Sequence, residues 1–355
     1  MLNSNPIMGT IYHALGGISA SSCYLPSQKL KKWSWGTFWI VQASFAWIIM
    51  PIVVGLITVP DFFHILSIAP LKSVVMAFIL GALYGFGGMS FGLSIKHIGY
   101  SLTYTIAIGI SAVLGTIIPL LIFGGIVEYF TRPGGGIVLT GMLISVIGVS
   151  LCGYAGFKKE KDLNELENKS TQFDMLTGLI LAIIAGILSG IFNVSLEFGQ
   201  PIADLAAKNG AENFEGNAKL IVSTSGCYLV NFIWFLILGI KENTLNQFST
   251  KSGISKNILL RNYVLSAFAG MLWCMQFFFY GIGHVKMGNF HFASWVLHMS
   301  MLIFFSYIVG IIMKEWKQVK KTTYITLIFA LLILILSFVI TAYGSVVGEG
   351  ILKAL

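Results

Sequence analysis

Long apolar stretches, each about the length of a membrane-spanning helix, recur along this whole sequence. A helix that crosses the hydrocarbon of a bilayer needs about 20 mostly apolar residues. Ten stretches fit, near residues 7–25, 35–59, 72–95, 101–124, 137–156, 175–199, 219–240, 259–283, 290–312 and 323–347. The alternating pattern of a membrane β-barrel strand is not present. The sequence therefore predicts an all-α polytopic membrane protein with ten transmembrane helices.

The composition excludes a soluble protein. Charged residues make up 10% of the 355 residues and hydrophobic residues 56%, whereas a soluble domain carries about 25% charged residues on its wetted surface. The mean hydropathy is correspondingly high, at +0.84. The four cysteines, at positions 23, 152, 227 and 274, form no paired motif, so we expect packing roles for them. We predict no metal site and no cofactor.

The Lys and Arg residues are distributed unevenly between the two sides of the predicted membrane. Of these 22 residues, 16 fall in the loops that follow the odd-numbered spans, and six fall on the side that holds both termini. Positive charge gathers in cytoplasmic loops, so we expect both termini to be periplasmic. The net charge of +8 is then a feature of membrane topology. It indicates the lipid bilayer as a partner and no nucleic acid.

The most polar segment, residues 158–174, divides the predicted spans into two sets of five. Because five is odd, the two sets must cross the membrane in opposite directions, which is the arrangement of inverted-repeat transporters. We therefore predict two inverted five-helix repeats. The first half covers residues 1–157, the polar cytoplasmic linker 158–174, and the second half 175–355.

Of the few ionisable side chains in the predicted spans, three are functional candidates: His13 in the first, Glu197 near the end of the sixth, and His298 in the ninth. An ionisable group within the bilayer is costly and is a functional candidate by default, and histidine exchanges protons readily near neutral pH. We predict these three as proton-coupling residues. Two simpler interpretations stay open. Glu197 can be an interfacial carboxylate, and each histidine can be a buried ring bonded to a backbone carbonyl.

Aromatic and amide side chains follow helical spacing on the eighth predicted span. Trp273, Gln276 and Tyr280 lie at positions i, i+3 and i+7, and so share one face. Aromatic rings pack against the C–H surface of a polyhydroxylated ligand while polar tips bond its hydroxyl groups. The predicted substrate-binding set is Tyr84, Trp273, Gln276, Tyr280 and Trp295. The alternative is that these aromatic residues fill the core or line the membrane interface.

Several motifs that would indicate other functions do not occur in the sequence. It contains no GxxxxGK[ST] loop for ATP, no HExxH motif, no Arg-rich voltage-sensing span and no TVGYG-like filter. It also offers no paired carboxylates or His–Asp set at one interface, so we predict that the protein is not an enzyme. An ion gradient is the remaining energy source for transport.

Several stretches resemble the bacterial L-rhamnose–proton symporters, a branch of the drug/metabolite transporter superfamily. The matching stretches are YHALGGISASSCYLPSQKLKKWSW (12–35), GALYGFGGMSFGLSIKHIG (81–99), IAIGISAVLGTIIP (106–119), GMLWCMQFFFYGIGH (270–284), SWVLHMS (294–300) and KEW (314–316). The resemblance extends over essentially the whole chain. It implies ten helices, the bacterial inner membrane, and uptake of L-rhamnose or a related 6-deoxy sugar with protons.

The resemblance also assigns residues by position. The matching ones are His13, Trp273, Gln276, Tyr280, Trp295 and His298. Glu197 and the loop 200–218 depart from the family pattern, where an uncharged amide is expected at position 197. We therefore expect a proton-coupled sugar importer that works by alternating access, and we expect the protein to be a monomer. The alternatives are an exporter or exchanger of another small metabolite on the same fold, and a sugar sensor without transport.

Overall fold

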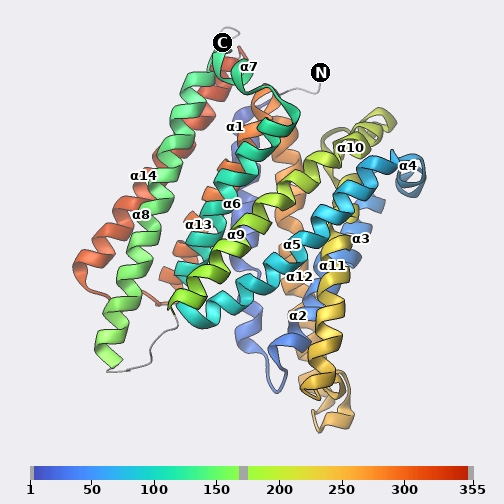
Figure 1. Ribbon diagram of the computed structural model, residues 1–355, viewed down its shortest axis with the longest axis vertical. Coiled ribbons are helices and arrows are strands. Elements are labelled where there is room, and N and C mark those ends of the chain that lie inside the picture. The colour runs from blue at the N-terminus through green and yellow to red at the C-terminus, as the bar shows by residue number, and fades with distance from the viewer. Residues whose placement is uncertain (1–3, 168–174, 351–355) are drawn as a thin grey trace. The chain divides into compact units, whose positions relative to one another are not determined.

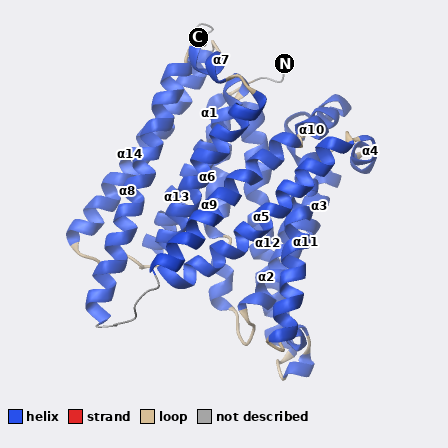
Figure 2. Ribbon diagram, in the orientation of Figure 1, coloured by secondary structure: helices blue, strands red, loops and turns tan. Residues whose placement is uncertain are grey.

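The computed structural model describes residues 4–167 and 175–350, and over these residues it consists of helices and loops without a strand (Figures 1 and 2). The long helices are α1 (Pro6–Ser22), α2 (Trp35–Ser44), α3 (Met50–Thr58), α5 (Leu71–Ile98), α6 (Tyr100–Phe123), α8 (Gly135–Glu167), α9 (Met175–Phe198), α11 (Gly216–Lys241), α12 (Lys256–Lys286), α13 (Ser294–Ile312) and α14 (Lys321–Gly348). The short ones are α4 (Phe62–Ile68), α7 (Ile126–Thr131) and α10 (Gln200–Ala206). The all-helical prediction is confirmed for the described part of the chain.

Nine helical segments in the described residues are long and apolar enough to cross a membrane. One of them, Trp35–Thr58, combines α2 and α3 through a π-helical turn at Phe45–Ile49. These nine correspond to the second to tenth predicted spans. The first predicted span corresponds to α1, whose 17 residues extend about 26 Å at 1.5 Å per residue. The protein is therefore a multi-pass membrane protein.

Two predicted boundaries differ from the structure. Helix α8 continues beyond the predicted span 137–156 to Glu167, because the Lys- and Glu-rich start of the polar linker consists of good helix formers. The rest of the linker, 168–174, lies outside the described residues. The ninth predicted span begins not as an α-helix but as a 3₁₀ segment, Gly288–Ala293, and α13 starts at Ser294.

The chain divides into two compact units that interleave along the sequence. Unit 1 comprises Met1–Ile18, Gly87–Val194 and Ile282–Leu355, and unit 2 comprises Ser19–Phe86 and Ser195–Gly281. The division falls inside four long helices, namely α1, α5, α9 and α12. Each unit is therefore built from segments of both the N-terminal and the C-terminal part of the chain.

In unit 1, α8 and α14 pack side by side (Figure 1). Glycines make this approach possible, since a Cβ atom on Gly148 would lie 2.7 Å from Cδ2 of Leu334 and one on Gly344 would lie 2.8 Å from the nitrogen of Val138. Small residues let membrane helices come this close. Beside this seam, Tyr307 of α13 is buried and donates a hydrogen bond to the Cys152 carbonyl.

Unit 2 is organised around α11. The Asn231 side chain of α11 donates to the Gly85 carbonyl of α5 at 3.0 Å and accepts a hydrogen bond from the Trp39 indole of α2 at 2.8 Å. Cys227, one turn earlier, donates to the Gly81 carbonyl at 3.1 Å. Polar side chains that bond across helices are a common source of cohesion in membranes. They fix α2, α5 and α11 in one register.

Candidate functional site

Two histidines meet inside unit 1. His13 of α1 and His298 of α13 are both fully buried, and their ring centroids lie 5.8 Å apart in an edge-to-face arrangement. A Cβ atom on Gly283 of α12 would lie 2.8 Å from Cε1 of His13, so only glycine leaves room for this ring. One turn after His13, a Cβ atom on Gly17 would lie 3.0 Å from the carbonyl carbon of Met301. Glycines therefore bring α1 close enough to α12 and α13 for the two imidazoles to meet.

Trp295 lies one turn before His298 on α13 and is 1% exposed. Its indole nitrogen donates to the Ser111 carbonyl of α6 at 2.8 Å, and the ring occupies the space in which a side chain on Gly115 would lie. The Asn193 amide of α9 bonds the Gly115 carbonyl at 2.8 Å. The polar atom of Trp295 is thus bonded within the protein and is not available to a ligand in this structure.

The predicted sugar-binding face of α12 lies in unit 2. Trp273, Gln276 and Tyr280 are all buried on this helix. Trp273 packs edge to face against Trp47, with ring centroids 5.6 Å apart, and against Phe277 at 5.0 Å. The face therefore combines an amide and a phenol with rigid aromatic surface, which suits a polyhydroxylated ligand. Tyr84 lies on α5 in the same unit and is half-buried.

An aromatic row continues from this face through unit 2. Trp47 packs against Trp39 at 6.0 Å between centroids, and Trp39 stacks on Tyr24 at 6.2 Å with the rings nearly parallel. Trp47 is not among the residues that the sequence predicts for the sugar-binding site. The available signal was its separation of eight residues from Trp39, which places both indoles on one face of the second span.

Glu197 lies at the end of α9, in a charged cluster of unit 2. The buried Lys219 of α11 interacts electrostatically with Glu197, Glu215 and Asp204. Its ammonium group donates to the Gln200 side-chain oxygen at 2.5 Å, and the Gln200 amide donates in turn to Asp204 and Glu215. Glu197 therefore has a cationic neighbour. Sequence reasoning missed Lys219 because it falls at the predicted start of a span, where a lysine normally reaches water.

The structure thus assigns the eight predicted site residues to two groups. Unit 1 contains His13, Trp295 and His298, and unit 2 contains Tyr84, Glu197, Trp273, Gln276 and Tyr280. Within unit 2, Glu197 interacts electrostatically with Tyr280, which links one predicted proton-coupling residue to one predicted sugar-binding residue. In the described parts of the chain, no three His, Cys, Asp or Glu side chains gather as a metal site would require.

Membrane-spanning helices with buried imidazoles and a buried aromatic–amide face are typical of one class, the membrane transporters for small molecules. Comparison with known proteins gives the particular family. The family model for the L-rhamnose-proton symport protein matches residues 2–347, and the chain belongs to this family. The L-rhamnose-proton symporters of Yersinia pestis (strain Pestoides F) and Yersinia pseudotuberculosis serotype O:1b (strain IP 31758) are each 31% identical over 347 residues, which cover 97% of this chain and 99% of each relative.

Proposed function

We propose that this protein takes up L-rhamnose, or a related 6-deoxy sugar, together with protons across the bacterial inner membrane. The observation that carries the proposal is the family match over residues 2–347. The site is compatible with it, because unit 1 supplies two buried groups that can exchange protons and unit 2 supplies a buried face suited to hydroxyl groups.

The predicted residues take two roles in this proposal. The sugar is bound by Tyr84, Trp273, Gln276, Tyr280 and Trp295. The proton is exchanged at His13 or His298, and Glu197 adjusts the local charge. A ligand shifts a two-state equilibrium only through its different affinity for the two states. Proton and sugar must therefore each raise the affinity for the other. In the proposed alternating-access cycle, binding of both favours one of the two facing states.

The proposed architecture is ten spans, with α1 as the first, arranged as two inverted repeats over 1–157 and 175–355. The division into units supports it. Its boundaries fall inside α1 and α5, the first and third spans of the first half, and inside α9 and α12, the first and third spans of the second half. Each half thus contributes the same pattern of segments to the two units, as two related repeats would.

The proposed orientation has both termini in the periplasm, which rests on the distribution of Lys and Arg among the loops. Reporter fusions at the C-terminus test it: alkaline phosphatase should be active there and green fluorescent protein dark. The reverse result would invert the topology. Light scattering on the purified protein in detergent, with the detergent mass subtracted, tests the proposed monomer.

Uptake of labelled L-rhamnose into proteoliposomes tests the function. Under an imposed gradient with acidic medium outside, the sugar should accumulate, and a proton ionophore should abolish accumulation. A panel of labelled 6-deoxy sugars in the same assay defines the substrate. Exchange with unlabelled metabolites that is indifferent to the pH gradient would instead indicate an exchanger. Sugar binding without any movement would indicate a sensor.

A further inference from the structure

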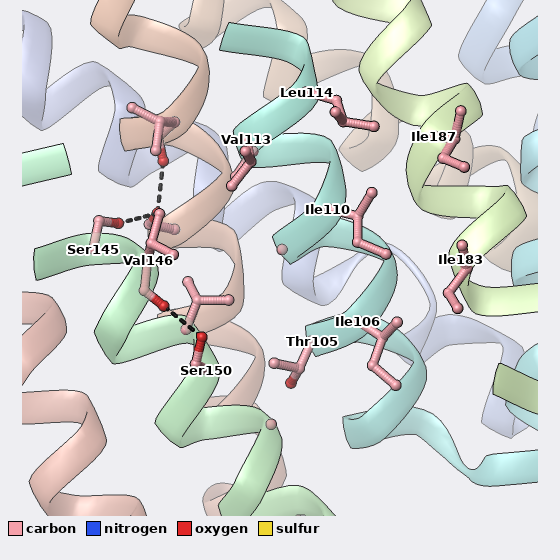
Figure 3. A pocket seen from close by; sticks show the side chains of 16 residues that line it. Thr105, Ile106, Ile110, Val113, Leu114, Ser145, Val146, Ser150, Ile183 and Ile187 are labelled. Carbon is pink, nitrogen blue, oxygen red and sulfur yellow. Dashed lines mark hydrogen bonds between the residues drawn. The ribbon is translucent and has the colours of Figure 1, made fainter. Parts of the chain in front are cut away.

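A cavity of about 620 Å³ lies in unit 1, between α6, α8, α9 and α13 (Figure 3). Aliphatic side chains make up most of its wall: Ile106, Ile110 and Val113 of α6, Val146 of α8, and Ile183 and Ile187 of α9. Figure 3 shows α6 as its floor, with the labelled α8 and α9 side chains on opposite sides. The volume lies in the range of ligand-binding pockets. We call this cavity the lateral groove.

The hydroxyl groups on the lateral groove are already bonded within the protein. Thr105 bonds the Ser101 carbonyl and the Tyr307 hydroxyl. Ser150 donates to the carbonyl of Val146 on its own helix. Ser300 donates to the Val296 carbonyl and also pairs with Ser145. A sugar in the groove would exchange its bonds to water for few bonds to protein, which is costly. The lateral groove is therefore suited to an apolar occupant.

Glycine contacts hold the floor and the two walls together. On one side, a Cβ atom on Gly109 of α6 would lie 2.8 Å from Cγ1 of Val149 on α8. On the other, a Cβ atom on Gly186 of α9 would lie 2.7 Å from the Ala107 carbonyl oxygen, and one on Gly190 would lie 3.0 Å from Cβ of Leu114. The helices are in contact at these glycines, while the larger aliphatic side chains that line the cavity leave space between α8 and α9. The groove is thus built by close packing beneath it.

The rim of the groove is apolar and exposed. Val146, Ile183 and Ile187 are 39%, 43% and 40% exposed, and they lie on helices that are long and apolar enough to span a membrane. Exposed apolar side chains at such positions face lipid hydrocarbon, so the groove is continuous with the lipid-facing surface of α8 and α9. We propose that the lateral groove is a binding site for one acyl chain of a bilayer phospholipid.

The physical basis is packing. An apolar side chain gains no hydrophobic energy by moving from lipid to protein, but an unfilled groove loses dispersion contacts along its whole wall. An acyl chain is thin and flexible enough to recover them. Because the wall is aliphatic, binding should depend on the chain and little on the headgroup.

Photo-crosslinking tests the proposal. The protein is placed in nanodiscs that contain a phosphatidylethanolamine with a diazirine halfway along one acyl chain, and labelled peptides are mapped by mass spectrometry. Labels should concentrate on 105–114, 145–153 and 183–187. Ser150→Phe and Ile187→Trp fill the groove from opposite walls, and each should reduce this labelling about fivefold or more, because a packed cavity leaves no volume for a chain.

Matched controls separate the groove from ordinary lipid contact. Ile147→Phe on α8 and Ile184→Trp on α9 alter lipid-facing residues that do not line the groove, so labelling should stay within about twofold of wild type. The proposal is overturned if the exposed residues of α14, such as Leu332 and Val339, are labelled as strongly as the groove. It is also overturned if labelling survives both filling variants. The wild-type labelling pattern is decisive even if a variant fails to fold.

Discussion

The imidazole rings of His13 and His298 lie 5.8 Å apart, centroid to centroid, at an interplanar angle of 68°, and neither ring is exposed. Two positive charges at this separation repel strongly in a poorly polarisable interior. We therefore expect the two rings to hold at most one proton between them and to titrate as a pair. In the proposed mechanism this pair would therefore carry at most one of the coupled protons.

His298→Ala should abolish sugar accumulation driven by a pH gradient in proteoliposomes, because the remaining ring loses the partner with which it exchanges the proton. His13→Ala should do the same. The double variant should be hardly worse than either single one, since residues that act as a unit are not additive. His64→Ala, at an exposed position on the short helix α4, serves as control and should leave uptake unchanged. Accumulation at the wild-type rate in His298→Ala would refute the assignment.

Gly283→Ala should impair uptake although it replaces no ionisable residue. The new methyl group would lie 2.8 Å from Cε1 of His13, so the ring must shift and its geometry with His298 changes. Overpacking of this kind costs about 1–3 kcal/mol. Gly281→Ala is the matched control two residues away, where the nearest atom to the added Cβ is 3.9 Å distant. Equal uptake rates for the two variants would show that the position of the His13 ring is unimportant.

Gln276→Ala should weaken sugar binding while the protein still folds. The loss of one hydrogen bond to a sugar hydroxyl corresponds to about a five- to tenfold increase in apparent KM. Phe268→Ala removes an exposed apolar side chain from the same helix and should leave KM unchanged. Size-exclusion profiles check folding, and equilibrium binding of labelled L-rhamnose checks affinity. Unaltered affinity in Gln276→Ala would remove this residue from the sugar site.

Most of the fold could be predicted from the sequence, because a membrane helix must present an apolar stretch long enough to cross the hydrocarbon and hydropathy detects such stretches. The predicted span 101–124 corresponds to Tyr100–Phe123 and the span 323–347 to Lys321–Gly348. Hydropathy fails to predict helix boundaries where the helix does not begin or end with the apolar stretch. Helix α8 continues into polar sequence as far as Glu167, and the start of the ninth span forms a 3₁₀ segment. Hydropathy does not distinguish these backbone forms.

The sequence indicated which residues belong to the candidate site, but it did not show which of them are in contact. A histidine inside an apolar span indicates function, and depth in the spans suggests a shared cavity, yet the sequence does not give the edge-to-face contact between His13 and His298. That contact depends on glycines such as Gly283, whose added Cβ would lie 2.8 Å from the His13 ring. Lys219 was missed for a related reason. Only the fold shows that it is buried near Glu197.

Gly115→Ala should destabilise unit 1. The added methyl group would collide with the indole of Trp295 and disturb its hydrogen bond to the Ser111 carbonyl. We expect a loss of about 1–3 kcal/mol from overpacking, seen as a lower melting temperature in detergent. Gly136→Ala is the control, because no atom lies within 4 Å of its added Cβ. A normal melting temperature for Gly115→Ala would mean that α6 and α13 adjust freely around Trp295.

Lys219→Met should destabilise the protein through the carboxylates it leaves behind. Glu197 and Glu215 both interact with the buried ammonium group, and its removal leaves negative charge without a buried counter-ion. Because these carboxylates are partly exposed, the cost should be about 2–4 kcal/mol, below that of breaking a fully buried pair. The melting temperature should fall accordingly. Lys208→Met, at an exposed position in the same connecting segment, should have little effect.

Glu197→Gln in the Lys219→Met background distinguishes an electrostatic role of Lys219 from simple packing. If Lys219 compensates Glu197, the second substitution removes the uncompensated charge and should recover about half of the lost stability, which appears as a coupling energy in the double-mutant cycle. If Lys219 contributes only the packing of its aliphatic stem, the two effects should add and the cycle should show no coupling. The same four proteins can be compared in proton-driven uptake. A Glu197 charge that adjusts coupling should make Lys219→Met and the double variant differ in transport as well as in stability.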